Sequence, residues 1–185
     1  MTRTEMKRTG LVLIGLLGVI VLAACTPAPA PTPEPTETPA PAPARDDIHV
    51  AVDGSGDYPT LEEAVAAASP RATITLGPGS YRLVRALEIK TSMKLIGAGM
   101  EETEIVSGAP GHVLSFNGSG SFEAEAISFR HDGEQMADVV VIESGTGRFV
   151  ACRFTGAIYE EGKGPRAGLR SNGSSRGTAQ ACEAT

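Results

Sequence analysis

The sequence predicts an all-β fold, a parallel β-helix in which short strands stack coil upon coil behind one short N-terminal helix. From residue 73 onward, apolar segments of three to five residues alternate with glycine turns, and none is long enough for a crossover helix. The composition agrees, because glycine is abundant (22 residues) and tryptophan is absent. An eight-residue pattern also recurs near the C-terminal end, which indicates a repeating architecture.

Three segments carry the recurring pattern and align with one another: residues 122–129, 147–154 and 177–184. The alignment makes Ile127, Cys152 and Cys182 equivalent, at separations of 25 and 30 residues. A parallel β-helix needs coils of about this length, and each coil buries its inward side chains against the next one, about 4.8 Å away. We therefore expect these three side chains to stack in successive coils.

The solenoid is expected to begin with an alternating strand (48–52) and a glycine-rich turn (53–57). Thr60 is a suitable helix N-cap, and Glu63 completes a capping box. The apolar residues that follow have helical spacing: Leu61, Ala64, Val65 and Ala68. We expect residues 69–70, Ser-Pro, to end this helix. Because two helical turns are unstable alone, the apolar stripe must pack on other elements.

Further strands are expected where β-branched and other apolar residues are bounded by glycine turns. They cover residues 73–76, 87–89, 93–96, 103–106, 113–114 and 139–142, with a weaker one at 168–169. The two-residue period of a strand would place alternate side chains in the core.

Residues 1–25 have the features of an export leader. A basic start precedes an unbroken apolar run, residues 11–22, which is shorter than the roughly 20 residues that span a bilayer. The run closes on Leu-Ala-Ala-Cys25, which resembles the bacterial lipoprotein signal. The resemblance implies that Cys25 is lipidated and holds the exported protein on a membrane surface. An ordinary signal peptide with a nearby cysteine is the alternative.

A proline-rich linker, residues 26–47, is expected between the leader and the β-helix domain, residues 48–185. Eight prolines lie between residues 26 and 44, which disfavours helix and sheet and favours extended polyproline II. At about 3.1 Å per residue, this part could reach roughly 60 Å. We interpret it as a stalk.

Charge and cysteine spacing exclude several functions. The net charge of −6 and the lack of a basic stripe argue against nucleic-acid binding. Cys152 and Cys182 belong to no Cys-x-x-Cys or Cys/His cluster, so no metal site and no cofactor are expected. If they stack, a disulfide is geometrically allowed, but buried free thiols are the expected state.

Residues 50–60, 74–81 and 95–105 together resemble the opening coils of pectinesterase-like and pectin-lyase-like proteins. The residues that carry the resemblance are Val-Ala-Val-Asp-Gly-Ser-Gly-Asp-Tyr-Pro-Thr, then Ile-Thr-Leu-Gly-Pro-Gly-Ser-Tyr, then Leu-Ile-Gly-Ala-Gly with Thr-Glu-Ile. The resemblance implies a right-handed parallel β-helix whose first helix caps the N-terminal end of the solenoid.

Pectinesterases of this family carry two aspartates and an arginine on one sheet face, where carboxylates act as acid, base and nucleophile. The segments that hold them, similar to Q-D-T-L, D-F-I-F-G and L-G-R-P-W, do not occur in this chain. The earlier G-x-Y-x-E motif is also broken, because Leu83 stands where the glutamate is expected after Tyr81. We therefore lean towards a non-catalytic protein.

Two loops hold the candidate site residues. Arg130, His131 and Asp132 lie at the end of an expected strand that leads into a loop. Their side chains suit acid–base catalysis or a sugar contact. The simpler interpretation is a solvated loop whose adjacent residues point in different directions. In the second loop, Tyr159 could stack on a sugar ring, and Glu160 is the other candidate ligand-binding residue. The alternatives are a solvated loop and packing of Tyr159 on its own coil.

The hypothesis favoured by the sequence is a surface lipoprotein whose β-helix binds carbohydrate or another surface partner without catalysis. The alternative is a carbohydrate-active enzyme of pectinesterase or polysaccharide-lyase type, and a third option is a non-functional gene remnant. No cap-like segment follows Cys182, so we also expect either a truncated member of a longer family or capping by self-association.

Overall fold

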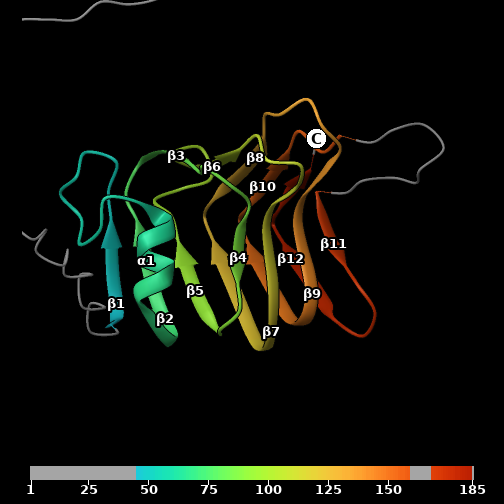
Figure 1. The fold of residues 1–185 in the computed structure, drawn as a ribbon, viewed down its shortest axis with the longest axis horizontal. Coiled ribbons are helices and arrows are strands. Elements are labelled where there is room, and N and C mark those ends of the chain that lie inside the picture. Colours follow the sequence, from blue (N-terminus) through green and yellow to red (C-terminus); the bar gives the residue numbers. More distant parts are fainter. Residues whose placement is uncertain (1–44, 159–167, 185) are drawn as a thin grey trace, which may run out of the picture. The chain divides into compact units, whose positions relative to one another are not determined.

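The computed structural model describes residues 45–158 and 168–184, and these form a parallel β-solenoid (Figure 1). Every ladder between two named strands in this part of the chain is parallel. The predicted all-β parallel β-helix with one short helix is confirmed. Candidate residues Tyr159 and Glu160, the leader, Cys25 and the proline-rich segment 26–44 lie outside the described residues.

One helix and thirteen strands are present in the described residues. They are β1 (Arg45–Val50), α1 (Leu61–Ala67), β2 (Ala68–Leu76), β3 (Gly79–Arg82), β4 (Leu87–Ile89), β5 (Met93–Ile96), β6 (Thr103–Ser107), β7 (Gly111–Glu125), β8 (Ser128–His131), β9 (Ala137–Val150), β10 (Arg153–Thr155), β11 (Leu169–Ser171), β12 (Arg176–Gln180) and β13 (Glu183–Ala184). Strand β1 begins three residues before the expected domain boundary at residue 48.

The described strands form two sheets that stack coil on coil. The larger one has the order β1-β2-β5-β7-β9-β11, with β4 paired to β7 and β12 paired to β9. The smaller one has the order β13-β10-β8-β6-β3. Strands β7 and β9 are long because each turns a corner and supplies two successive positions of its coil, as their register shows (Figure 1).

The register confirms the repeat that the sequence predicts. Arg153 lies opposite both Ser128 and Glu183, so the preceding residues Ile127, Cys152 and Cys182 also stack in successive coils. Both thiols are free in the structure; Cys152 is buried and Cys182 is partly buried. Burial raises the pKa of the Cys152 thiol to about 11, which keeps it protonated and unreactive near neutral pH.

A ladder of left-handed residues precedes this stack. Ala126, Ala151 and Ala181 have φ angles of 58°, 50° and 52°. Alanine in this region costs roughly 1–2 kcal/mol relative to the right-handed conformation. The same sharp bend recurs at each of these corners, because all three coils must turn there to keep their strands in register.

All five phenylalanines of the chain pack together in the core: Phe116, Phe122, Phe129, Phe149 and Phe154. Phe129 and Phe154 are stacked one coil apart, with ring centroids 5.8 Å apart and planes within 8°. Phe149 meets three of the other rings edge-on. Aromatic pairs are each worth about 0.5–1.5 kcal/mol beyond the area that they bury, so the cluster adds to the stability of the core.

The helix packs as its apolar pattern predicts. Thr60 accepts a hydrogen bond from the Glu63 amide (3.2 Å), which confirms the predicted N-cap. Leu61 and Ala64 are buried. The helix ends one residue earlier than expected, because Ala68 is already extended and lies opposite Arg45 as the first residue of β2.

Among the residues that the structure describes, no helix has both the length and the apolar character needed to cross a membrane.

The alanine ladder makes a testable prediction about stability. Replacing Ala151 with glycine removes the left-handed penalty while adding the entropy cost of glycine, so Ala151→Gly should be neutral or stabilise by up to about 1 kcal/mol. The matched control, Ala124→Gly in the buried part of β7, should destabilise by roughly 1 kcal/mol. Urea unfolding of both variants measures the difference, and a clear loss of stability in Ala151→Gly would contradict the strain argument.

Candidate functional site

The outer face of the five-stranded sheet gathers ionisable side chains from separate coils. Inward residues of β3, β6 and β8 (Tyr81, Ile105 and Phe129) are buried, so their neighbours in sequence point outward. The register then builds two outward rows. One row holds Ser80, Glu104, Ser128, Arg153 and Glu183, and the other holds Arg82, Val106, Arg130 and Thr155. Ser128 and Val106 are buried although they belong to these rows.

We call this surface the ion-pair face and define it by seven residues: Arg82, Glu101, Glu104, Arg130, Asp132, Arg153 and Glu183. At its centre, Arg130 on β8 binds Glu104 on β6 through two hydrogen bonds. The Nε–Oε1 distance is 2.8 Å and the Nη2–Oε2 distance is 3.3 Å. Ser80 on β3 also lies 3.4 Å from Glu104 Oε2 and donates to it. The carboxylate of Glu104 is therefore held from two neighbouring coils.

Asp132, directly after β8, completes the central group. Its carboxylate accepts hydrogen bonds from both terminal nitrogens of Arg82, one of them Nη1 at 3.3 Å from Oδ1. The same carboxylate lies 3.8 Å from Arg130 Nη1. Arg82 thus reaches across β6 to a residue fifty positions later in the sequence, and the two ion pairs join into one network.

A second ion-pair group lies one coil further along. Arg153 on β10 donates from Nε to Glu183 on β13 (2.9 Å) and from Nη1 to Glu101 (2.8 Å). The Arg153 side chain is one-quarter exposed, while that of Glu101 is 70% exposed. Glu101 therefore presents a solvent-facing carboxylate at the border of the face.

The structure separates the three sequence-predicted residues of the first loop. Arg130 and Asp132 share the ion-pair face, but His131 points inward, is buried, and has Nε2 3.1 Å from the carbonyl oxygen of Ala109. Its Nδ1 has no hydrogen-bond partner. Strand β8 ends at His131 and Asp132 follows it, so the cluster lies at the end of a strand as expected. Alternation along the strand explains why neighbouring side chains diverge.

Sequence reasoning missed Arg82, Glu104 and Arg153, because each is an isolated charge in its own segment. The signal that would have found them is the coil register. Once the strands 79–82, 103–107 and 128–131 are aligned, Ser80 and Arg82 fall beside Glu104 and Arg130. The sequence pattern did not predict the short strand β3. The residues of β3 could therefore not be aligned with those of β6 and β8 from the sequence.

The electrostatics of the face suit binding better than proton transfer. The hydrogen bond from Arg82 lowers the pKa of Asp132, so this carboxyl is ionised at neutral pH. A carboxyl that acts as a general acid needs a raised pKa instead, so that it stays protonated. Hydrogen bonds to carboxylates likewise raise the pKa of Arg82 and Arg130, which remain cations. Within residues 45–158 and 168–184, no group of three or more His, Cys, Asp or Glu side chains could hold a metal ion.

A second ionisable group lies on the larger sheet. Asp138 is fully buried, with Oδ2 3.0 Å from Arg170 Nε, although that N–H is poorly aligned for a hydrogen bond. His112 lies opposite Asp138 in the register of β7 and β9. Because Asp138 has no exposed surface through which a substrate could reach it, we interpret this group as structural.

No protein-family model matches the sequence, and no curated protein matches it. Among solved structures, the chain is similar to the crystal structure of a pectin methylesterase mutant in complex with a hexasaccharide. The TM-score is 0.58 at 16% identity, over 74% of this chain and 48% of that one. Another similar structure is ORF18 of Geobacillus virus E2, with a TM-score of 0.49 at 21% identity, over 66% of this chain and 27% of that one.

The fold is the right-handed parallel β-helix of pectin methylesterase. This confirms the handedness and the architecture that the opening residues implied. At 16% identity the likeness concerns the fold alone, and the chain spans about half the length of the pectin methylesterase structure. The chemistry of the face therefore has to be argued from its own residues.

His112 generates a prediction about pH. Burial lowers its pKa from the usual value of about 6.5, more than the nearby carboxylates raise it. The unfolded chain therefore binds this proton more readily than the folded one, so its contribution to stability is present above pH 6.5 and is lost as the pH falls below that value.

The expected result is that His112→Gln weakens the decrease in unfolding free energy between pH 7 and pH 5. Urea unfolding at a series of pH values measures this slope. A second variant that removes the imidazole, His112→Asn, should weaken the slope in the same way. Equal slopes in wild type and His112→Gln would contradict the assignment.

Proposed function

We propose that the β-helix binds a polysaccharide along the ion-pair face without cleaving it. The observation that carries the proposal is the placement of three arginines, each hydrogen-bonded to carboxylates, on one outward face. Strands β3 and β10 are three strand spacings apart, about 14 Å, so Arg82 and Arg153 would contact well-separated parts of a ligand. An extended polymer fits that spacing better than a single small molecule.

The side chains of the face have the hydrogen-bonding capacity that sugar hydroxyls require. Guanidinium groups donate and carboxylates accept, and both types alternate across the coils. Glu101 and Arg82 are mostly exposed, with side-chain exposures of 70% and 63%. Because each arginine is already held by a carboxylate, little side-chain entropy would be lost on binding. The similar pectin methylesterase structure, which contains a hexasaccharide, adds support from a protein of the same fold.

The proposal is for a non-catalytic module. Asp132 is held as a carboxylate by Arg82, which makes it a poor proton donor. The sequence also lacks the segments that carry the pectinesterase aspartates and arginine. We further propose that the protein is an exported lipoprotein, with acyl chains on Cys25 and a proline-rich stalk that holds the β-helix away from the membrane. The basic start, the apolar run and Leu-Ala-Ala-Cys25 support this part of the proposal.

A carbohydrate-active enzyme of pectinesterase or polysaccharide-lyase type is the second candidate. One observation favours it: Arg130 lies within 3.8 Å of Asp132 while it binds Glu104, so two carboxylates and an arginine are close together on one sheet face. Turnover of pectin or another uronic-acid polymer that disappears in Asp132→Asn would establish this alternative and overturn the non-catalytic proposal.

Binding can be tested with the detergent-solubilised full chain and a panel of neutral and acidic polysaccharides, by isothermal titration calorimetry. Arg130→Gln should weaken binding at least ten-fold, because it removes the central cation of the face and the two hydrogen bonds that Glu104 accepts from Arg130. The matched control is Arg148→Gln on the other sheet, whose ion pair with Glu123 is long at 3.8 Å. The control should bind as the wild type does.

Two outcomes would contradict this proposal. One is that no polysaccharide in the panel binds to the wild-type chain. The other is that Arg130→Gln and Arg148→Gln weaken binding equally, which would show that the ion-pair face has no special role.

The anchor is tested separately by Cys25→Ser. A chain lipidated at Cys25 should fractionate with membranes and gain the mass of its acyl chains, because several acyl chains give stable membrane binding. The variant should lose both properties while its β-helix folds unchanged. Fractionation with mass spectrometry of the mature protein measures this. A wild-type mass without lipid would contradict the anchor and would leave the test of glycan binding unaffected.

A further inference from the structure

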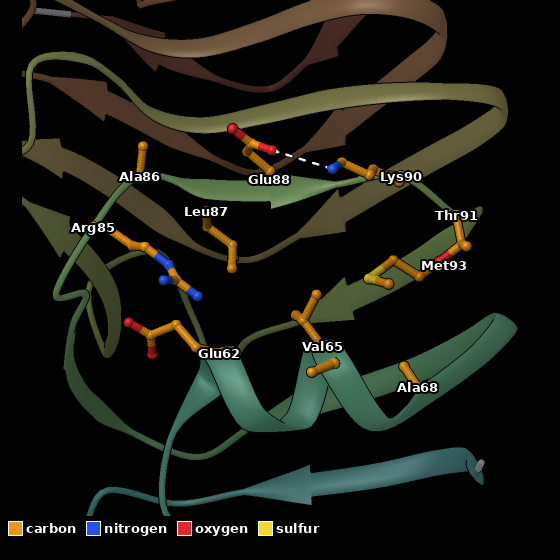
Figure 2. A pocket seen from close by; sticks show the side chains of 11 residues that line it. Glu62, Val65, Ala68, Arg85, Ala86, Leu87, Glu88, Lys90, Thr91 and Met93 are labelled. Atoms are coloured by element: carbon orange, nitrogen blue, oxygen red, sulfur yellow. Dashed lines mark ion pairs between the residues drawn. The ribbon is translucent and has the colours of Figure 1, made fainter. Parts of the chain in front are cut away.

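A groove of about 580 Å³ lies between helix α1 and strand β4. Val65, Leu87 and Met93 point into it from α1, β4 and β5 (Figure 2). Glu62 and Arg85 line one end, and Lys90 lines the other (Figure 2). The groove is thus apolar along its floor and charged at its ends.

Strand β4 is an edge strand within the described part of the chain. It pairs with β7 on one side, and on that side β9 and β11 continue the stack. Its other side faces the groove. An edge strand presents backbone N–H and C=O groups that can pair with another extended segment.

The order of the chain explains why this edge is left uncovered. Helix α1 leads directly into β2 as β4 leads into β5, and β2 pairs with β5. The helix therefore takes the place in the first coil that β4 takes in the next. Paired strands lie about 4.8 Å apart, whereas a helix with its side chains is about 10 Å across, so α1 cannot approach β4 as closely as a strand would.

A hydrogen bond next to β4 shows that backbone N–H groups in this segment need an acceptor. The amide of Val84 donates to Glu62 Oε1 on α1 (3.0 Å), so a side chain accepts the backbone hydrogen bond just before β4. Val84 itself is 95% exposed. Further along the same segment, the groove separates β4 from the helix.

We propose that this groove binds an extended peptide segment of a partner protein, which adds to β4 as a further strand. Main-chain hydrogen bonds to β4 would provide affinity, and alternate apolar side chains would contact Val65 and Met93. Two acidic and two basic side chains line the groove (Glu62, Glu88, Arg85 and Lys90), so the peptide should carry little net charge.

A second copy of this chain fits the groove poorly. Pairing β4 with the β4 of another copy would also bring that copy's α1 towards the groove, and a helix with its side chains is about 10 Å across. A sugar polymer also fits poorly, because its hydroxyl groups cannot reproduce the regular alternation of N–H and C=O groups that pairs with a strand edge. An extended peptide supplies the main-chain N–H and C=O groups that a strand edge can pair with, and it brings no helix into the groove.

The test uses the full chain in detergent micelles and a fluorescently labelled peptide, Ac-Lys-Val-Thr-Val-Glu-NH₂, whose charged ends keep it soluble. Fluorescence anisotropy should show saturable binding. The same peptide with N-methylated backbone amides keeps its side chains but cannot pair with a strand edge, so it should bind at least ten-fold more weakly. Equal binding of the two peptides would overturn the proposal, as would the absence of saturable binding.

Two alanine substitutions locate the site. Ala66 is an exposed residue of α1 that lines the groove, so Ala66→Phe should fill it and weaken peptide binding at least ten-fold. Ala98 is also exposed but follows the C-terminal end of β5 and does not line the groove, so Ala98→Phe should have no effect. Unchanged binding to Ala66→Phe would place the peptide elsewhere. Displacement of the peptide by a neutral hexasaccharide would identify the groove as a glycan site instead.

Discussion

The structure depends on one constraint, the stacking of each coil on the next at the spacing of a single strand. Inward residues can be buried only by their counterparts one coil away, as Phe129 and Phe154 show with parallel rings 5.8 Å apart. The same constraint forces three alanines into left-handed corners and fixes which outward side chains meet. Arg82 and Asp132 form an ion pair across fifty residues because two coils bring them to the same face.

Local sequence patterns predicted only those parts of the fold that neighbouring residues determine. Alternation predicted the strand near Ile48, helical spacing with Thr60 predicted α1, and the late repeat predicted the stack of Cys152 on Cys182. Local patterns cannot show where a helix gives way to a strand when tertiary pairing decides it. Ala68 suits a helix, but its place opposite Arg45 makes it the first residue of β2.

The sequence predicted only some residues of the candidate site, because tertiary pairing also decides which side chains meet there. Arg130 and Asp132 are two residues apart, so a sequence scan could propose them together. Their partners Glu104 and Arg82 come from other coils, and only the register of β3, β6 and β8 brings them close. The pairing also changes their chemistry, because the pKa of Asp132 is lowered by an arginine that the sequence gives no reason to connect with it. The groove beside β4 likewise results from geometry, since a helix occupies the place of a strand.

The central claim is that coil register makes the ion-pair face act as one unit. A double-mutant cycle between Arg82 and Asp132, read out as polysaccharide affinity of the full chain, tests this most directly. Arg82→Gln, Asp132→Asn and the double variant should show a coupling free energy of about 1 kcal/mol, because either single change already weakens the charge-assisted hydrogen bonds between the two side chains. Strictly additive effects on affinity would contradict the account, because the pair would then have no joint role in binding.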